Sequence, residues 1–490
     1  MKDRDKYVEI AQEVEDAVEG EKAVKAKTTR YLPKLTGMYD AEDGDDLYNS
    51  FIGWAKWFPA TGRTFDAYQG SLFRKQPINN LKGLNKDFIT DFTDIGDTLE
   101  AGAREISGNL MKHGMGMVLV DYPSIDTTTL TLAQANNLGI KPYAIIYNIF
   151  QIADWVYDNT FGRKILRSVT LEEQHEVTEP QYIQYVRKEA VEEDSITIRR
   201  KVYLDDNMIY KQDIYLRLKK SNNEYEYSLV DTKTPTINGE PLNFLPVVPF
   251  NETGLVFKYQ YPMLFDISSV NYVDYRNDAL LRNIYFLVGR PMPWVVGLKP
   301  EESNSTGLQY GSSRILELEN GGQCGMLGGD ATSASALYNE SVRLKQEMST
   351  IGSRSLAADP NGVEAARTAE IHRMGETGCL STIAKITSSV IRRSLWYMFK
   401  WMNEEINEEN IQYEIQTDFV PNTIESATMA VLFEQYMLGK IPLEVLFYNL
   451  RKSDLLPDSM TKESFEANLV KKEPMEEVKE DTSVVEVLNS

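Results

Sequence analysis

The stretch that decides the fold is DISSVNYVDYRNDALLRNIYFLVG, residues 266–289. Its apolar residues recur at helical spacing, at Ile267, Val270, Val273, Leu280, Ile284 and Leu287. Asp266 or Ser268 can cap the start, and Gly289 followed by Pro291 ends the pattern. The spacing predicts one long helix with an apolar face along one side.

The segments after this helix alternate between helix and a small glycine-rich β-module. Residues 290–331 contain six glycines between Gly307 and Gly328, and we expect short strands at 294–296 and 314–318. A polar helix is expected over 332–351. A loop follows, and Asp359-Pro-Asn, with Glu364, suits the start of a further helix that reaches about residue 403. Gly375 and Gly378 predict a bend or an interruption in that helix.

The first 120 residues are predicted to be mainly helical. Residues 1–18 resemble a charged, peripheral helix, and aromatic-rich helices are expected at 45–57 and from Thr61 to just before Pro77. A long helix is predicted from Asn85 to His113, ended by Gly114 and Gly116. Because these glycines end a helix and open a strand at 117–120, they do not match a dinucleotide-binding fingerprint, which requires the opposite order.

The rest of the chain completes an α+β pattern. Residues 142–250 alternate strands rich in Tyr, Ile and Val with turn signals, which predicts an antiparallel β-rich region. A helix pair is expected at 423–438 and 442–453, joined at Gly439-Lys440. Residues 471–490 are charged and lack aromatic residues, so we predict a disordered acidic tail.

Composition limits the possible functions. Two distant cysteines, Cys324 and Cys379, and three histidines cannot build a zinc site or a disulfide framework. The formal charge is −21, which repels a polyanion, so tight DNA binding is not expected. Residues 1–20 lack the apolar core of a signal peptide and no apolar run is long enough for a membrane span, so we expect a protein that stays in the cytoplasm where it is made.

The order helix, β-module, helix, short loop, long helix and small helical domain resembles the portal (head-to-tail connector) proteins of tailed bacteriophages. Four strings carry the resemblance: Tyr31-Leu-Pro-Lys-Leu, Gly70-Ser-Leu-Phe-Arg-Lys-Gln-Pro, Val273-Asp-Tyr-Arg-Asn-Asp and Asn361-Gly-Val-Glu-Ala-Ala. The resemblance covers most of the chain in element order. Unlike larger members of that family, this sequence has no long helical barrel after the C-terminal helices.

The resemblance implies an α+β portal-like subunit with an α/β wing, a helical stem hairpin, a β-containing clip and a helical crown. The implied segments are a wing (1–263), a stem helix (264–289), a clip (290–331), a second stem helix (332–351), a tunnel loop (352–361), a wing helix (362–407), a crown (408–470) and the acidic tail (471–490).

The resemblance also implies a function without catalysis. The chain would form a ring of twelve copies at one capsid vertex of the virion, assembled in the host cytoplasm, through which double-stranded DNA is packaged and ejected without sequence specificity. The implied protein partners are the terminase large subunit, a head-tail adaptor or tail protein, and the major capsid protein. Twelve helices packed roughly 9 Å apart enclose a hole about 25 Å wide, enough for a duplex.

Two sets of site residues follow from the same resemblance. The tunnel loop would turn Gly352, Ser353, Arg354, Ser355 and Leu356 toward DNA. Arg354 would touch a phosphate or, equally well, pair with an acid of a neighbouring copy.

The clip would offer Trp294, Lys299, Glu301 and Glu302 to the docking partner. A solvated turn explains the three charged residues as well, and Trp294 suits the clip core or a subunit contact.

Two rival functions remain open at this stage. The chain could be another virion shell or adaptor protein. It could also be a metal-dependent DNA-processing enzyme, but its acid pairs, Asp45-Asp46 and Asp205-Asp206, fall at predicted caps or turns. No phosphate-binding Gly-x-x-x-x-Gly-Lys-Ser/Thr loop occurs in the sequence, so the motor ATPase is not favoured. No catalytic residue, metal site or cofactor is therefore predicted.

Overall fold

The structure is a computed structural model that describes residues 2–39, 42–80, 87–123, 140–160, 162–176, 195–219, 225–237, 239–289, 292–298, 318–327, 331–352, 366–417, 419, 426–452, 455–456, 460 and 462–470. The chain divides into two compact units, Met1–Thr417 and Asp418–Ser490. The mixture of helices and antiparallel sheets confirms the predicted α+β class.

The N-terminal helix α1 (Lys2–Glu19) belongs to the core of the first unit. Ala11, Val14 and Ala17 are fully buried, and the helix packs against α4, α6 and α9. The prediction of a peripheral helix was therefore wrong. Its high charge suggested exposure, but the small apolar residues form one closely packed stripe, and Asp16 is buried as well.

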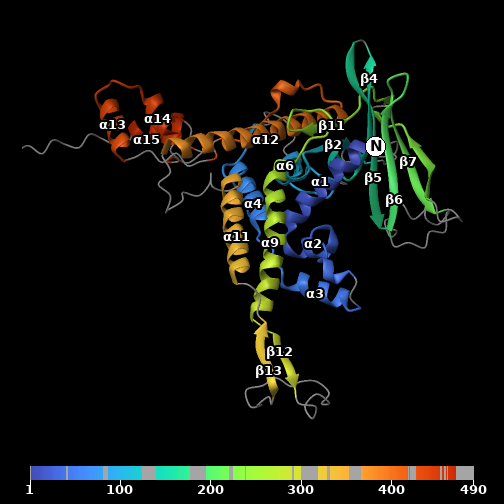
Figure 1. The fold of residues 1–490 in the computed structure, drawn as a ribbon. Helices are drawn as coiled ribbons and strands as arrows, with labels where there is room; N and C mark the ends of the chain where they lie inside the picture. Colours follow the sequence, from blue (N-terminus) through green and yellow to red (C-terminus); the bar gives the residue numbers. More distant parts are fainter. Residues whose placement is uncertain are drawn as a thin grey trace, which may run out of the picture. The chain divides into compact units, whose positions relative to one another are not determined.

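Short helices follow α1 and fill the space beside α9 (Figure 1). They are α2 (Glu21–Ala26), η1 (Thr28–Arg30), η2 (Thr36–Met38), α3 (Gly44–Trp54) and α4 (Ala60–Leu72). The predicted aromatic-rich helices correspond to α3 and α4. Phe51, Trp57 and Tyr68 are buried in this layer, as their density in the sequence indicated.

The predicted helix from Asn85 to His113 is interrupted. Only a short helix, α5 (Asp87–Thr90), precedes the long α6 (Leu99–His113). Gly96 has a φ of +86°, and the Thr98 side chain caps α6 by accepting a hydrogen bond from the Ala101 amide. The chain therefore turns before α6 starts. Gly114 ends α6 in the left-handed conformation, as predicted.

Two antiparallel sheets follow. A three-stranded sheet has the order β11-β2-β3, and a five-stranded meander has the order β4-β5-β6-β7-β8. Their strands are β2 (Met115–Asp121), β3 (Tyr143–Asn148), β4 (Ile152–Thr160), β5 (Arg163–Glu176), β6 (Ser195–Leu204), β7 (Tyr210–Lys219), β8 (Tyr225–Lys233) and β11 (Val247–Asn251); β9 (Thr236–Ile237) and β10 (Glu240–Pro241) pair in a small hairpin. The antiparallel β-rich region is confirmed, although β4 had not been predicted.

A buried ion-pair cluster joins the two sheets. The Arg200 guanidinium on β6 lies 3.3 Å from an Asp121 carboxylate oxygen on β2 and 3.1 Å from Glu173 on β5. Tyr147 on β3 donates a 2.6 Å hydrogen bond to Glu173. Burial alone would raise the pKa of Glu173, but Arg200, His175 and Tyr147 lower it to about 2.

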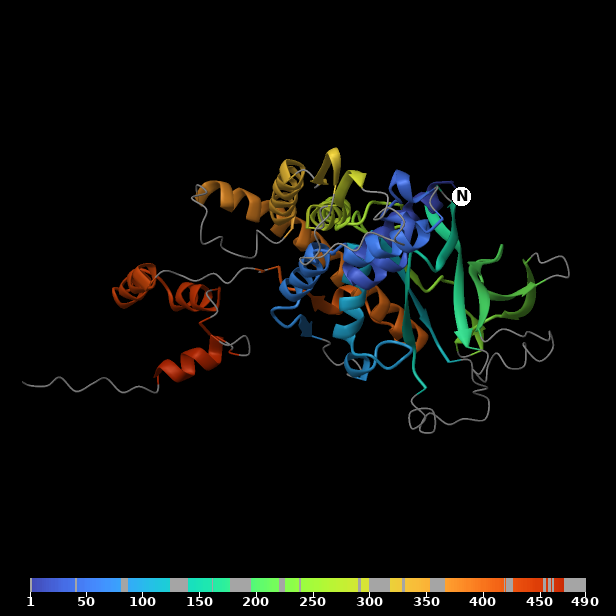
Figure 2. The ribbon, with the colours of Figure 1, turned by 60° about the horizontal axis from the view of Figure 1, so that its bottom comes forward.

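Helix α9 (Phe265–Gly289) and helix α11 (Ala331–Ile351) lie side by side, and both views show a β-hairpin at their common end (Figures 1 and 2). The hairpin consists of β12 (Met292–Leu298) and β13 (Leu318–Leu327). Strand β12 contains the predicted strand 294–296. The second strand was predicted at 314–318, but β13 begins at Leu318 and runs through the glycines, while residues 314–317 lie outside the described residues.

Helix α12 (Ala366–Trp401) is continuous in its backbone through Gly375 and Gly378, so the predicted interruption does not occur. Its C-terminal half is buried against β2, β11 and α6, and the Trp401 indole donates a 3.1 Å hydrogen bond to the Val120 carbonyl. The predicted helix start at 359–361 lies outside the described residues.

After α12 the chain stays in the first unit up to Thr417. The short helix η5 (Glu408–Asn410) is followed by β14 (Gln412–Glu414), which pairs with β1 (Ile78–Asn80). The second unit thus starts at Asp418, ten residues after the predicted crown boundary at 408.

The second unit contains α13 (Ser426–Met437), α14 (Leu443–Lys452) and α15 (Lys462–Val470). The predicted helix pair corresponds to α13 and α14, whereas α15 was not predicted as a helix. Phe447 and Leu450 are buried, but Val431, Met437 and Tyr448 are exposed. Within the described part of the chain, no helix combines the length and apolar character needed to cross a membrane.

Candidate functional site

The candidate functional site is the surface of α9, α11 and the β12–β13 hairpin. A polar seam holds the two helices together. The buried Asp274 carboxylate accepts a 2.8 Å hydrogen bond from the Ser341 hydroxyl, and the Asn277 side chain donates a 2.9 Å hydrogen bond to the Leu337 carbonyl. Burial raises the pKa of Asp274, although Ser341 and the charge of Lys345 oppose that shift. Such directional contacts fix the register of α9 against α11.

A second polar contact ties α9 to the start of α4. The Asn271 side chain is fully buried. Its Oδ1 accepts hydrogen bonds from the Thr61 amide (3.2 Å) and hydroxyl (3.0 Å), and its Nδ2 donates to the Phe58 carbonyl (2.9 Å). Thr61 lies in the first turn of α4, where amides lack partners within the helix. Asn271 therefore caps α4 from another helix.

The aromatic residues of α9 face the N-terminal helices. The Tyr272 ring lies 4.4 Å from the Tyr31 ring and 5.1 Å from the Trp57 ring, and Tyr275 packs 5.8 Å from Trp57. The Arg276 guanidinium donates to the Tyr31 carbonyl at 2.8 Å. The string beginning at Tyr31, noted in the sequence, thus contacts the string beginning at Val273.

The predicted apolar face of α9 was wrong in part. Ile267 is buried, but Val273 is 45% exposed and Leu280 is 37% exposed. The helix instead buries Asn271 and Asp274 between its aromatic residues. Hydrogen bonds to other elements make this burial possible, and helical spacing alone could not indicate them.

Five exposed residues of α9 form a continuous line, which the exposed Tyr285 and Phe286 near its end do not join. Asp266, Ser269, Val273, Arg276 and Leu280, spaced alternately by three and four residues, are all exposed. We call these five residues the α9 stripe. Alternating steps of three and four place residues on one side of a helix, which is the spacing used when one helix packs on another.

Helix α11 buries only a narrow strip. Its exposed side carries Tyr338, which is 55% exposed, and Val342, which is 39% exposed. These two residues lie one turn apart, and we call them the α11 face. Beside them, Arg343 pairs with Glu340 at 2.6 Å and with Glu347 at 3.0 Å.

The β12–β13 hairpin exposes apolar side chains as well. Trp294 is 40% exposed and Val296 is 61% exposed. The Trp294 ring lies over Gly325 on the opposite strand, where an added Cβ would approach the indole to 2.8 Å. This contact explains why a glycine lies within β13.

Two of the nine predicted site residues lie among the residues that the structure describes. Trp294 is exposed on the hairpin. Gly352, predicted to face DNA from the tunnel loop, is instead buried: an added Cβ would lie 2.6 Å from both Ile267 and Thr64, and the Gly352 amide donates a 2.8 Å hydrogen bond to the Met348 carbonyl. Gly352 therefore follows α11 in a closely packed position. The other predicted residues, Ser353, Arg354, Ser355, Leu356, Lys299, Glu301 and Glu302, lie outside the described residues.

The described residues bring together no group of three or more His, Cys, Asp or Glu side chains that could hold a metal ion. The features that sequence reasoning missed are the exposed stripe of α9 and a cavity beside Glu252. The three-four spacing of the stripe was present in the sequence. Its exposure depends on which side of α9 the N-terminal helices cover.

Comparisons with known proteins give limited matches. Residues 262–402, from just before α9 to the end of α12, match a family described as a domain of unknown function, DUF4055. No curated protein matches the sequence. Among solved structures, a chain of "Neck of empty GTA particle computed with C6 symmetry" matches with 11% identity and a TM-score of 0.37, over 89% of this chain and 95% of that chain. Neither value supports an inference about fold or function.

Proposed function

We propose that this chain is the subunit of a portal, a ring at one capsid vertex of a phage virion through which double-stranded DNA enters and leaves. The observation that carries the proposal is the pair of exposed apolar lines on α9 and α11. These helices are joined by a buried polar seam, yet they present Val273 and Leu280 on one helix and Tyr338 and Val342 on the other. Exposed apolar surface of this kind is typical of subunit contacts.

The two surfaces suit a head-to-tail contact between copies. The α9 stripe of one copy would pack on the α11 face of the next. Because the two surfaces differ, each copy carries one of each. Repeating the same contact builds a closed ring when the rotations between neighbouring copies add up to one full turn. A ring of twelve copies, the number in the portal family that this chain resembles, would leave a central hole wide enough for a DNA duplex.

The acidic composition supports a channel through which DNA slides. A net charge of −21 keeps phosphates hydrated and away from the wall, so no deep binding site slows the passage of DNA. On the same resemblance, residues 353–361 of the tunnel loop, Arg354 among them, are proposed to face the DNA.

The proposed protein partners also follow from the resemblance. The terminase large subunit and later a head-tail adaptor or tail protein would dock at the β12–β13 hairpin, where Trp294 and Val296 are exposed. The major capsid protein would surround the ring. Exposed apolar residues of the second unit, such as Met437 and Tyr448, support packing of that unit against further copies.

The test measures assembly of the purified full-length chain by mass photometry and negative-stain imaging. The wild-type chain should form rings of about a dozen copies. The double variant Val273→Glu, Leu280→Glu should remain monomeric, because a carboxylate buried at each contact is unpaired. The matched control is Val156→Glu, which changes a valine of similar exposure on the edge strand β4 and should still form rings.

Two results contradict the proposal. Rings formed by the double variant would show that the α9 stripe is not the contact. A wild-type chain that stays monomeric or dimeric and cleaves DNA in the presence of divalent cations would favour a DNA-processing enzyme instead.

A further inference from the structure

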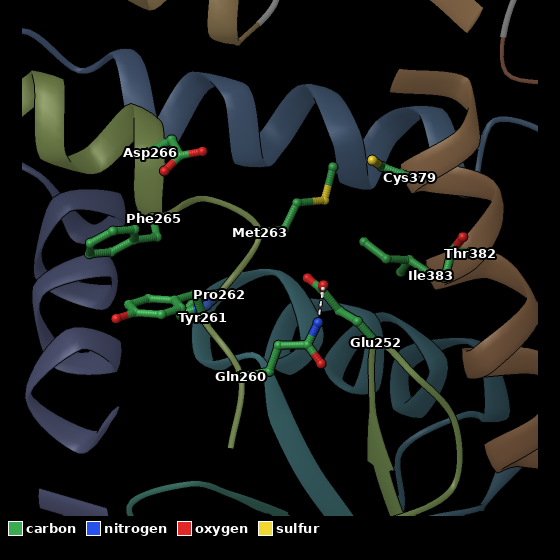
Figure 3. Close-up of a pocket in the computed structure, with 10 residues that line it drawn as sticks. All are labelled: Glu252, Gln260, Tyr261, Pro262, Met263, Phe265, Asp266, Cys379, Thr382 and Ile383. Carbon is green, nitrogen blue, oxygen red and sulfur yellow. Dashed lines mark hydrogen bonds between the residues drawn. The ribbon is translucent and has the colours of Figure 1, made fainter. Parts of the chain in front are cut away.

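A cavity of about 610 Å³ lies between the segment that leads into α9 and one side of α12 (Figure 3). Its wall consists of Glu252, Gln260, Tyr261, Pro262, Met263, Phe265, Asp266, Cys379, Thr382 and Ile383. The volume falls within the range of small-molecule sites. The wall combines apolar side chains with two carboxylates.

The carboxylate of Glu252 is the main polar group of this cavity. Figure 3 shows the Glu252 carboxylate and the Ile383 side chain pointing into the same space, beside Met263. Gln260 donates a 3.0 Å hydrogen bond to Glu252 from its Nε2. Among the described residues, no lysine, arginine or histidine forms an ion pair with Glu252.

A half-buried carboxylate without a cation is electrostatically unfavourable. Burial is the cause that raises the pKa of Glu252 above its ordinary value. A ligand with a positive charge would offset this cost, because it supplies hydrogen-bond donors and a counter-charge to a carboxylate already withdrawn from water.

The second carboxylate and the shape of the space favour an elongated ligand. Asp266 lines this cavity and also a smaller one of about 200 Å³, which shares Met263 and Cys379 with the first. The two cavities therefore adjoin at Asp266. Ile267 and Ile351 extend the apolar wall into the smaller cavity.

We propose that this cavity binds a linear aliphatic polyamine. One ammonium group contacts the Glu252 carboxylate, a second contacts Asp266, and the methylene chain packs on Met263, Phe265 and Ile383. Two carboxylates balance two of the three positive charges of a triamine such as spermidine, and the third can stay in solvent at the exposed Asp266 end. The apolar wall suits methylene groups better than a hydrated metal ion. The proposal is tested on single copies, because Asp266 also belongs to the α9 stripe and a neighbouring copy would cover it in the proposed ring.

The experiment is calorimetric titration of spermidine into the full-length chain. Glu252→Gln keeps the shape of the side chain but removes its charge, and it should weaken binding at least tenfold. Asp266→Asn should weaken binding by a smaller factor, because Asp266 is more exposed. Glu240→Gln, on the exposed hairpin strand β10, is the matched control and should leave the affinity unchanged.

A further variant separates binding in the cavity from general attraction to an acidic protein. Ile383→Ser should weaken spermidine binding severalfold through lost apolar contact while leaving weak Mg²⁺ binding unchanged. A single cooperative melting transition confirms that each variant is folded, and Ile383→Ser should melt at a lower temperature than wild type because Ile383 is buried. The same affinity for wild type and Glu252→Gln would overturn the proposal. Spermidine that binds single copies but not assembled rings would support the cavity as its site and show that a neighbouring copy covers Asp266.

Discussion

Replacing Asn271 by alanine should destabilise the first unit more than any change on the exposed side of α9. The substitution removes the two hydrogen bonds that Asn271 accepts from Thr61 and the one that it donates to Phe58. It leaves the Thr61 amide without this partner, at a site where Asn271 is fully buried, whereas the Phe58 carbonyl keeps its 2.8 Å hydrogen bond from the Ala60 amide.

The magnitude follows from the cost of such groups. A buried polar group left without a partner costs about 1–3 kcal/mol, and the Thr61 amide is one such group. No side chain at the start of α4 offsets the loss, since Pro59 at the N-cap position makes no capping hydrogen bond. We therefore expect Asn271→Ala to lower the free energy of unfolding by an amount within that range.

The assay is urea unfolding of the full-length chain at fixed protein concentration, followed by circular dichroism. Ser269→Ala is the control, because Ser269 lies two residues away on the exposed α9 stripe and should change the free energy of unfolding by less than about 0.5 kcal/mol. Equal unfolding midpoints for the two variants would refute the role of Asn271 as a cap.

Two further predictions concern the sheets. Because the folded-state pKa of Glu173 lies near 2, below its ordinary value of 4.5, its contribution to stability is present above pH 4.5 and is lost as the pH falls toward 2. Urea midpoints measured from pH 7 to pH 2.5 should show this loss in wild type and a smaller one in Glu173→Gln; equal slopes would contradict it. Gly116→Ala should lower the melting temperature by several degrees, because its Cβ would lie 2.6 Å from Phe250 and 2.7 Å from the Tyr147 carbonyl, whereas Gly70→Ala, with open space around the added Cβ, should not.

Single glycines in the sequence correctly predicted where some helices end. Gly114 ends α6 in the left-handed conformation, and Gly439, with a φ of +69°, follows α13 where the helix pair was predicted to be joined. In both cases one residue without a Cβ allows the backbone to turn. Such signals act over a few residues and can be read without the rest of the fold.

Tertiary contacts decided the elements that were mispredicted. The turn before α6 is held by Thr93, which bridges to Ala144 on β3, far along the chain. On α1, Asp16 is buried because it accepts hydrogen bonds from the Tyr31 hydroxyl and from Gln12. Charge and periodicity cannot reveal partners of this kind.

The candidate site was only partly predictable for the same reason. The order of α9, β12, β13 and α11 followed from caps, glycines and helical spacing, and the structure contains these elements in that order. The cavity beside Glu252 gave no signal, because its wall joins Glu252 to Cys379 and Ile383 on α12 through the fold alone.

The distribution of polar and apolar residues on α9 gives the central argument for assembly. A helix of a monomeric protein usually buries its apolar residues and exposes its polar ones. Helix α9 buries Asn271, Asp274 and Asn277 and exposes Val273 and Leu280. The hydrogen bonds of the buried polar residues fix the register of α9 and replace those to water at little net gain, although removing one partner is costly. Val273 and Leu280 remain partly exposed within one copy, and the contact with a second copy proposed above would bury them further.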